Sequence, residues 1–133
     1  MTADVKLTRN QSLVLGVLTH AAAPKSAYDV LDSLRAEGFR APLQVYRALE
    51  KLIELGLVHR LESLNAFVAC ADPHDHAGHE HGITAFAICE DCGTVTEFHD
   101  QGIDGRLNAW QNAEHFKPKK TTIEIRGHCK DCA

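Results

Sequence analysis

Two Cys-x-x-Cys pairs are the most reactive groups in this sequence: Cys89 with Cys92, and Cys129 with Cys132. Each pair can chelate one side of a metal ion. Two pairs brought together by a fold make a tetrahedral thiolate cage, the geometry that structural zinc prefers. Two redox dithiols, or a disulfide link between the pairs, are the alternatives. Because two matched spacings rarely arise by accident, we expect a structural zinc site.

A fifth cysteine, Cys70, lies outside both pairs and precedes a histidine-rich stretch that contains His74, His76, His79 and His81. A thiol beside imidazoles can contribute to a second metal site. The plainer interpretation is a small buried residue in a strand. Whether Cys70 binds a metal is therefore the first question about the function of this protein.

The bulk composition is that of ordinary globular material, with 133 residues, 44% of them hydrophobic and 24% charged. No apolar run approaches the roughly 20 residues that cross a bilayer, and the N-terminus lacks a charged leader followed by an apolar segment. We therefore expect a cytoplasmic protein without membrane contact, in which thiols stay reduced. The formal net charge of −4 divides into +1 for residues 1–70 and −5 for residues 71–133. The first half thus permits DNA binding through a few positioned cations.

Residues 1–71 have the pattern of a winged helix-turn-helix domain. A capping box at Thr8 and Gln11 predicts the start of the first helix. Pro42 suits the first position of the third helix, and Gly56 suits the position after its end. We expect three helices and a two-stranded hairpin, over residues 8–20, 26–38 and 42–55, and over 57–62 and 66–70.

The third helix of such a domain enters the major groove of DNA. Gln44, Arg47 and Lys51 share one of its faces, and Tyr46 is beside them. Arg47 can bind guanine or phosphate, and the ring of Tyr46 can contact a thymine methyl. These four are our candidate DNA-binding residues. The alternative is a solvated helix face.

The second half reads as a linker over residues 72–81 and a small α/β dimerisation domain over 82–133. Strands are expected at 82–88, 94–98 and 121–126, with a helix at 102–114, which predicts an antiparallel three-stranded sheet and an α+β protein overall. About 50 residues support only a thin core. A zinc cage and a twofold homodimer that extends the sheet would both compensate for it.

Several motifs occur together in one order along the chain: Leu7-Thr-Arg-Asn-Gln11, Val45-Tyr-Arg-Ala-Leu49, Gly56-Leu-Val-His59, Ile88-Cys-Glu-Asp-Cys-Gly93 and His128-Cys-Lys-Asp-Cys132. Together they resemble the ferric uptake regulator family of metal-sensing bacterial repressors, most of all its zinc uptake regulators. The resemblance covers residues 7–132 and implies a DNA-binding domain, a dimerisation domain and a regulatory metal site at the hinge.

Carried over from the family, the regulatory ligands are His59, Cys70, Glu97 and a histidine shortly before Cys89. Family spacing favours His81, with His79 as the alternative. One thiolate among imidazole and carboxylate donors suits tetrahedral zinc, whereas iron or manganese sensors would be expected to lack the thiolate.

The resemblance thus implies a repressor of zinc-uptake genes with two zinc ions per subunit, one structural and one regulatory, that binds double-stranded operator DNA as a homodimer. A family member that senses iron, manganese or peroxide is the main alternative. A zinc-buffering protein would have no use for Tyr46 and Arg47. A zinc hydrolase would need an open metal position beside a substrate pocket. A chain this small shows no evident substrate cleft in its sequence, so we expect no enzyme and no small-molecule substrate.

Overall fold

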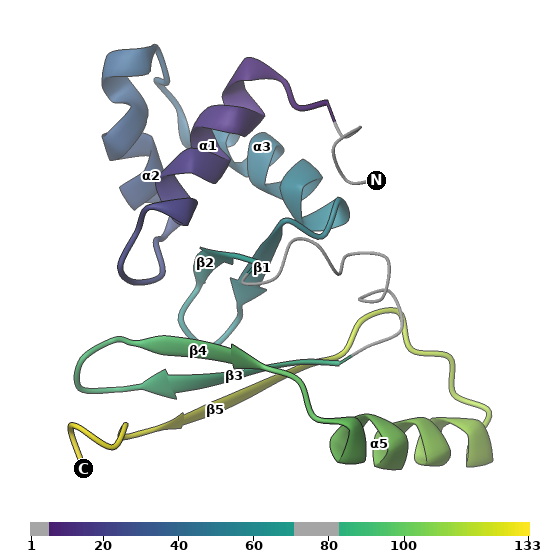
Figure 1. The fold of residues 1–133 in the computed structure, drawn as a ribbon. Coiled ribbons are helices and arrows are strands. Elements are labelled where there is room, and N and C mark those ends of the chain that lie inside the picture. Colours follow the sequence, from purple (N-terminus) through teal and green to yellow (C-terminus); the bar gives the residue numbers. More distant parts are fainter. Residues whose placement is uncertain (1–5, 71–82) are drawn as a thin grey trace. The chain divides into compact units, whose positions relative to one another are not determined.

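The computed structural model describes residues 6–70 and 83–133, which belong to two compact units (Figure 1). The predicted linker, residues 72–81, lies outside the described residues, as do its four histidines. No helix among the described residues is long and apolar enough to span a bilayer.

The first unit begins with two helices that start at side-chain caps. In α1, Arg9–Thr19, the Thr8 hydroxyl accepts the N–H of Gln11 at 3.2 Å, and the Gln11 side chain accepts the N–H of Thr8 at 3.0 Å. In α2, Ala27–Leu34, Ser26 and Asp29 form the same reciprocal pair. A short 3₁₀ turn, Arg35–Glu37, continues α2 and ends at Gly38 with a φ of 102°. The predicted capping box at Thr8 is confirmed.

The third helix, α3, spans Pro42–Glu54 and packs on α1 and α2 (Figure 1). Gly56 follows it with a φ of 78°, a left-handed conformation that glycine adopts without strain. Burying each large apolar side chain contributes roughly 1.5–3 kcal/mol, and one core joins the three helices to the hairpin. Its members include Val14, Leu18, Val30, Leu31, Val45, Leu49, Leu52, Val58 and Phe67.

The hairpin consists of β1, Val58–Leu61, and β2, Ala66–Ala69, paired antiparallel. Its register places His59 opposite Val68. Three helices followed by this hairpin confirm the predicted winged helix-turn-helix order.

The second unit contains β3, Thr84–Cys89; β4, Val95–Phe98; α5, Gln101–Ala113; and β5, Thr122–Gly127. The strand order is β4-β3-β5. The α+β class and the number of strands in this sheet are as predicted. The direction of the third strand is not: β4 is antiparallel to β3, but β5 is parallel to it, so the sheet is mixed.

The path of the chain explains this difference. β4 ends where β3 begins, because Phe98 pairs with Ala85. The chain then passes through α5 and re-enters the sheet at that same end, where Thr122 pairs with Thr84. A strand that starts beside the start of β3 must run parallel to it.

Candidate metal centres and nucleic-acid interface

The four paired cysteines form one cluster in the second unit. Cys89 ends β3, Cys92 follows in the turn before β4, and Cys129 and Cys132 follow β5. Their sulfur atoms all lie within 4.8 Å of one another, and the Sγ atoms of Cys92 and Cys129 are 3.8 Å apart. All four are free thiols, so the structure contains no disulfide between the two pairs.

Backbone groups hold the two halves of the cluster together. The N–H of Glu90 donates to the carbonyl of Gly127 at 2.8 Å and continues the ladder between β3 and β5. The N–H groups of Cys92 and Cys129 approach Cys89 Sγ at 3.5 and 3.4 Å. These two donors favour the thiolate, and they lower the pKa of Cys89 from 9.0 to about 6.

The pKa values of two neighbouring thiols shift in opposite directions. Hydrogen bonds with the side chain and backbone of Thr94 lower the pKa of Cys92. The pKa of Cys132 rises to about 12, because its S–H donates to Cys129 and Cys89 and because a further negative charge there is unfavourable. Four sulfurs this close cannot all ionise unless a cation compensates them. The donor set therefore fits a thiophilic divalent ion such as zinc.

Polar side chains outside the cage also connect its two halves. His128 Nδ1 lies 2.7 Å from Asp91 Oδ2, and Arg126 Nε lies 3.9 Å from Glu90 Oε2. His128 directly precedes the cage residue Cys129 in the sequence. The contacts of Asp91 and Thr94 were not predicted from the sequence, although these residues lie one and two positions from Cys92.

The second predicted ligand set is distributed over both units. His59 lies on β1, and Cys70 directly follows β2, where its N–H donates to the carbonyl of Leu57 at 2.8 Å. Leu57 and His59 are two residues apart, so the side chains of His59 and Cys70 share one face of the hairpin. Their ligand atoms lie within 4.8 Å of each other.

Glu97 belongs to β4 of the second unit. Its Oε2 lies 3.2 Å from Nε2 of His99, a contact that the sequence gave no spacing reason to expect. The side chain of Glu97 is 5% exposed and that of His99 is 40% exposed. His79 and His81 lie outside the described residues.

The candidate DNA-binding residues of α3 differ in how they are engaged. Tyr46 and Arg47 are exposed. The ammonium of Lys51 lies 3.2 Å from Glu54 Oε1 in a surface ion pair. Gln44 has a structural task as well: its Oε1 accepts the N–H groups of Arg40 and Ala41 at 2.7 and 3.1 Å, which closes the start of the helix.

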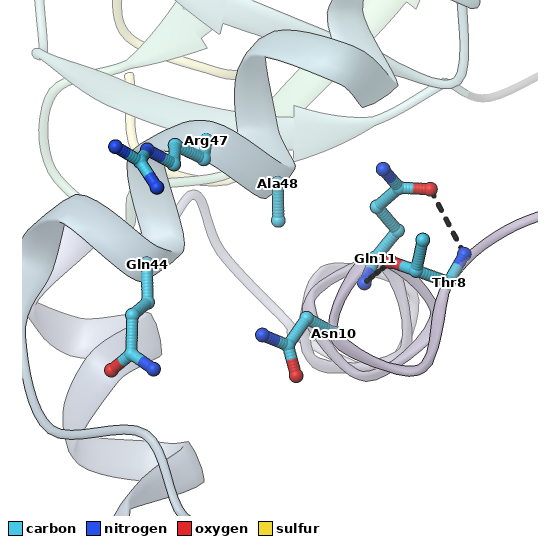
Figure 2. Close-up of a pocket in the computed structure, with 6 residues that line it drawn as sticks. All are labelled: Thr8, Asn10, Gln11, Gln44, Arg47 and Ala48. Carbon is cyan, nitrogen blue, oxygen red and sulfur yellow. Dashed lines mark hydrogen bonds between the residues drawn. The ribbon is translucent and has the colours of Figure 1, made fainter.

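An open hollow of about 300 Å³ lies between the start of α1 and α3 (Figure 2). Thr8, Asn10 and Gln11 line it from α1, and Gln44, Arg47 and Ala48 line it from α3. Two of the predicted DNA-binding residues therefore form one wall of this hollow.

A sequence model of the ferric uptake regulator family matches residues 2–126. The chain belongs to the ferric uptake regulator family. It is accordingly a transcription regulator and not an enzyme, as predicted.

Among its relatives, the zinc uptake regulation protein of Escherichia coli K12 is 36% identical over 130 residues, which cover 97% of this chain and 74% of that protein. A zinc uptake regulator in complex with zinc and DNA has a TM-score of 0.86 at 34% identity, over 96% of this chain and 83% of the other. Holo XcZur has a TM-score of 0.84 at 38% identity, over 96% and 86%. The predicted resemblance to zinc uptake regulators is confirmed.

Other branches of the family match as well. The ferric uptake regulation protein of Neisseria meningitidis serogroup B is 31% identical over 98% of this chain and 88% of its own length.

Proposed function

We propose that this protein is a zinc-responsive transcriptional repressor that binds operator DNA as a homodimer and represses zinc-uptake genes. Each subunit would hold two zinc ions. The structural ion belongs to Cys89, Cys92, Cys129 and Cys132, whose thiols already cluster within 4.8 Å. Family membership and the similarity to a regulator that binds zinc and DNA support the proposal.

The regulatory ion would be bound by His59, Cys70 and Glu97, with His81 as the fourth ligand and His79 as the alternative. The observation that carries this assignment is the common hairpin face of His59 and Cys70, with ligand atoms within 4.8 Å. A thiolate and an imidazole this close form half of a tetrahedral site. The thiolate favours zinc over iron or manganese.

Ligands on both units give such a site a regulatory effect. When bound, zinc supplies a cross-link between the winged-helix unit and the dimerisation unit. His59 and Cys70 fix one end of that link to the hairpin beside α3, and Glu97 fixes the other end to β4. In a dimer, the angle between the units sets the spacing of the two α3 helices, which must match two half-sites. Zinc and DNA would then share a coupling free energy of about 1–3 kcal/mol, and the coupling is reciprocal.

The alternative is a regulator of this family that senses another metal or peroxide. Ferric uptake and peroxide operon regulators are among the relatives, at 31% and 27% identity. Cys70 distinguishes the two proposals, because a site built from the remaining imidazole and carboxylate ligands would suit iron or manganese equally well.

The deciding experiment measures metal content and operator affinity on the same preparations of the wild type and of Cys70→Ser. We expect the wild type to hold two zinc ions per chain and to bind operator only when both are present. Cys70→Ser should keep one zinc ion and lose zinc-dependent binding. His20→Ala is the matched control, because His20 Nδ1 bonds within its own helix, to the carbonyl of Gly16. Unchanged zinc dependence in Cys70→Ser would contradict the proposal, and so would a wild type that retains iron in place of zinc.

A further inference from the structure

The hollow between α1 and α3 has walls that donate hydrogen bonds and carry no negative charge. Its six lining residues include one cation, Arg47, three side-chain amides and one hydroxyl, and no acid (Figure 2). Within residues 6–70 and 83–133, Arg47 makes no ion pair. Among these described residues, the guanidinium thus keeps its donors for an outside partner.

Two helix caps determine which way the glutamine amides face. The Oε1 of Gln11 is occupied by the N–H of Thr8, and the Oε1 of Gln44 is occupied by the N–H groups of Arg40 and Ala41. A backbone N–H requires the carbonyl oxygen of a side-chain amide, so the orientation of each amide is fixed by its cap. Both NH₂ groups are left over as donors at the rim of the same hollow.

Asn10 adds a third amide from the α1 side, opposite Gln44 (Figure 2). Ala48 lines the hollow with a single methyl group, and its small size leaves the space open. Amide donors from both helices and a guanidinium on α3 surround a space that faces solvent. A ligand suited to this surface is negatively charged, offers several acceptors and reaches the surface from outside.

We propose that this hollow receives a phosphate of the operator backbone, with Asn10 and Gln11 as DNA contacts outside α3. The proposal rests on the proposed DNA-binding function, and it is continuous with that surface because Gln44 and Arg47 belong to both. Backbone contacts of this kind fix the register of a recognition helix and carry no sequence information themselves. The hollow would thus position α3, and the Arg47 guanidinium at its edge would be shared between this phosphate and the neighbouring bases that Tyr46 also contacts.

The test exchanges one rim NH₂ group for a negative charge without disturbing the fold. Gln11→Glu keeps the capping box, since a carboxylate oxygen accepts the N–H of Thr8 as the amide oxygen does and glutamate is a favoured residue there. Ser12→Glu is the matched control, because it places the same charge one residue later, at an exposed position that does not line the hollow. Both variants and the wild type are titrated with operator DNA and with a scrambled duplex at several salt concentrations.

We expect Gln11→Glu to weaken binding roughly tenfold or more on both duplexes and to reduce the slope of log affinity against log salt by about one. Ser12→Glu should change affinity much less. Equal effects of the two variants, or a loss confined to the operator duplex, would overturn the proposal. Absence of operator binding by the wild type would instead refute the proposed function, so the two failures are distinguishable.

A second variant tests the same surface with the opposite sign. Asn10→Lys adds a cation at the hollow, and we expect it to raise affinity for both duplexes several-fold. Placed in the first turn of α1, a lysine is slightly unfavourable for the helix, so a gain in DNA binding cannot be attributed to a more stable fold. Unchanged or weaker binding by Asn10→Lys would count against a phosphate in this hollow.

Discussion

Cys89, the last residue of β3, is paired with Gly127, the last residue of β5, across parallel strands. Both Cys-x-x-Cys pairs therefore leave the sheet at one end, and the Glu90 N–H extends the pairing one residue further. The sheet register thus brings the four cysteines of the proposed metal cage together at one end of the sheet.

Loss of one cage ligand should destabilise the second unit. Its helix α5 has no buried residue, so the sheet and the cage carry most of its stability. We expect Cys132→Ser to remove the structural zinc and to destabilise the unit by more than about 4 kcal/mol, the range typical of a lost metal site. Thermal unfolding with metal analysis measures this effect. Cys70→Ser, outside the cage, should leave the unfolding of this unit unchanged. A Cys132→Ser variant as stable as Cys70→Ser would contradict the assignment.

The cage thiols should react at different rates once the metal is removed. With a pKa of about 6, Cys89 is a thiolate at pH 7, while Cys132, with a pKa of about 12, remains protonated. Brief alkylation of the chelated protein, followed by mass spectrometry, should label Cys89 first and Cys132 last. In denaturant the two rates should converge. Equal labelling in the folded protein would show that the backbone N–H groups do not stabilise the Cys89 thiolate.

The lowered pKa of Cys89 also makes the stability of the metal-free second unit depend on pH. The lowered pKa of Cys89 stabilises the folded, metal-free unit fully above the ordinary thiol pKa of 9.0. This contribution declines as the pH falls and is lost below about pH 6. Unfolding of the chelated protein between pH 6 and 9 measures it, and greater stability at the lower pH would contradict the expectation.

Arg47 should matter more for operator binding than Lys51. The guanidinium is exposed and makes no ion pair within residues 6–70 and 83–133, whereas the Lys51 ammonium is shared with Glu54. We expect Arg47→Ala to weaken operator binding by about 1–3 kcal/mol and to relax base preference. Lys51→Ala should cost less and affect all sequences alike. Electrophoretic or fluorescence titrations on operator and mutated operator distinguish the two, and a reversed order would refute this division of roles.

Exposed apolar side chains of the second unit predict where the subunits of the proposed homodimer make contact. Ile125 is 51% exposed and Trp110 is 56% exposed, and β5 forms one edge of the sheet. We expect Ile125→Lys to weaken dimerisation at least tenfold, as measured by sedimentation at several concentrations. Leu43→Lys makes the same exchange at an exposed residue of the first unit and should leave the dimer intact. If both variants stay dimeric, the contact lies elsewhere.

The hydrogen bond between His128 and Asp91 should slow the loss of the structural metal. It spans the two halves of the cage at 2.7 Å, with both side chains about half exposed. We therefore expect His128→Ala to accelerate zinc transfer to a chelator while changing stability by no more than about 1 kcal/mol. His115→Ala, at a histidine that does not adjoin the cage, should transfer zinc at the wild-type rate.

Much of the first unit could be predicted from local signals. Thr8 and Gln11 mark the start of α1, and Pro42 and Gly56 bracket α3, because caps and turns depend on neighbours in the sequence. The clustering of the four cysteines was predictable for a similar reason, since the spacing of each pair carries the chemistry.

The direction of β5 could not be read from its own residues. Alternation along Thr122–Gly127 predicts a strand but says nothing about its partner or orientation. The predicted cage contained the missing information. An antiparallel β5 would have carried Cys129 to the far end of β3, about 20 Å from Cys89 for a six-residue strand. The predicted antiparallel sheet and the predicted four-cysteine cage were therefore incompatible. The cage requires a β5 that runs parallel to β3.

The role of Gln44 in capping the start of α3 was also not predicted from the sequence. It was predicted as a DNA-facing residue from its position on the helix, and that role stays a prediction. Its cap was missed because Ala41, the residue before the helix, has no side-chain acceptor, so the glutamine three positions later provides one.

If Gln44 contacts DNA as predicted, that arrangement links the start of α3 to the choice of operator. Drawing the Gln44 side chain toward a base would leave the backbone N–H groups of Arg40 and Ala41 without their acceptor. A serine at position 41 would supply a hydroxyl of its own for the start of the helix. Gln44 would then be released to adopt new rotamers. The set of operators that the protein binds would broaden through a substitution at position 41, which is not one of the predicted DNA-binding residues.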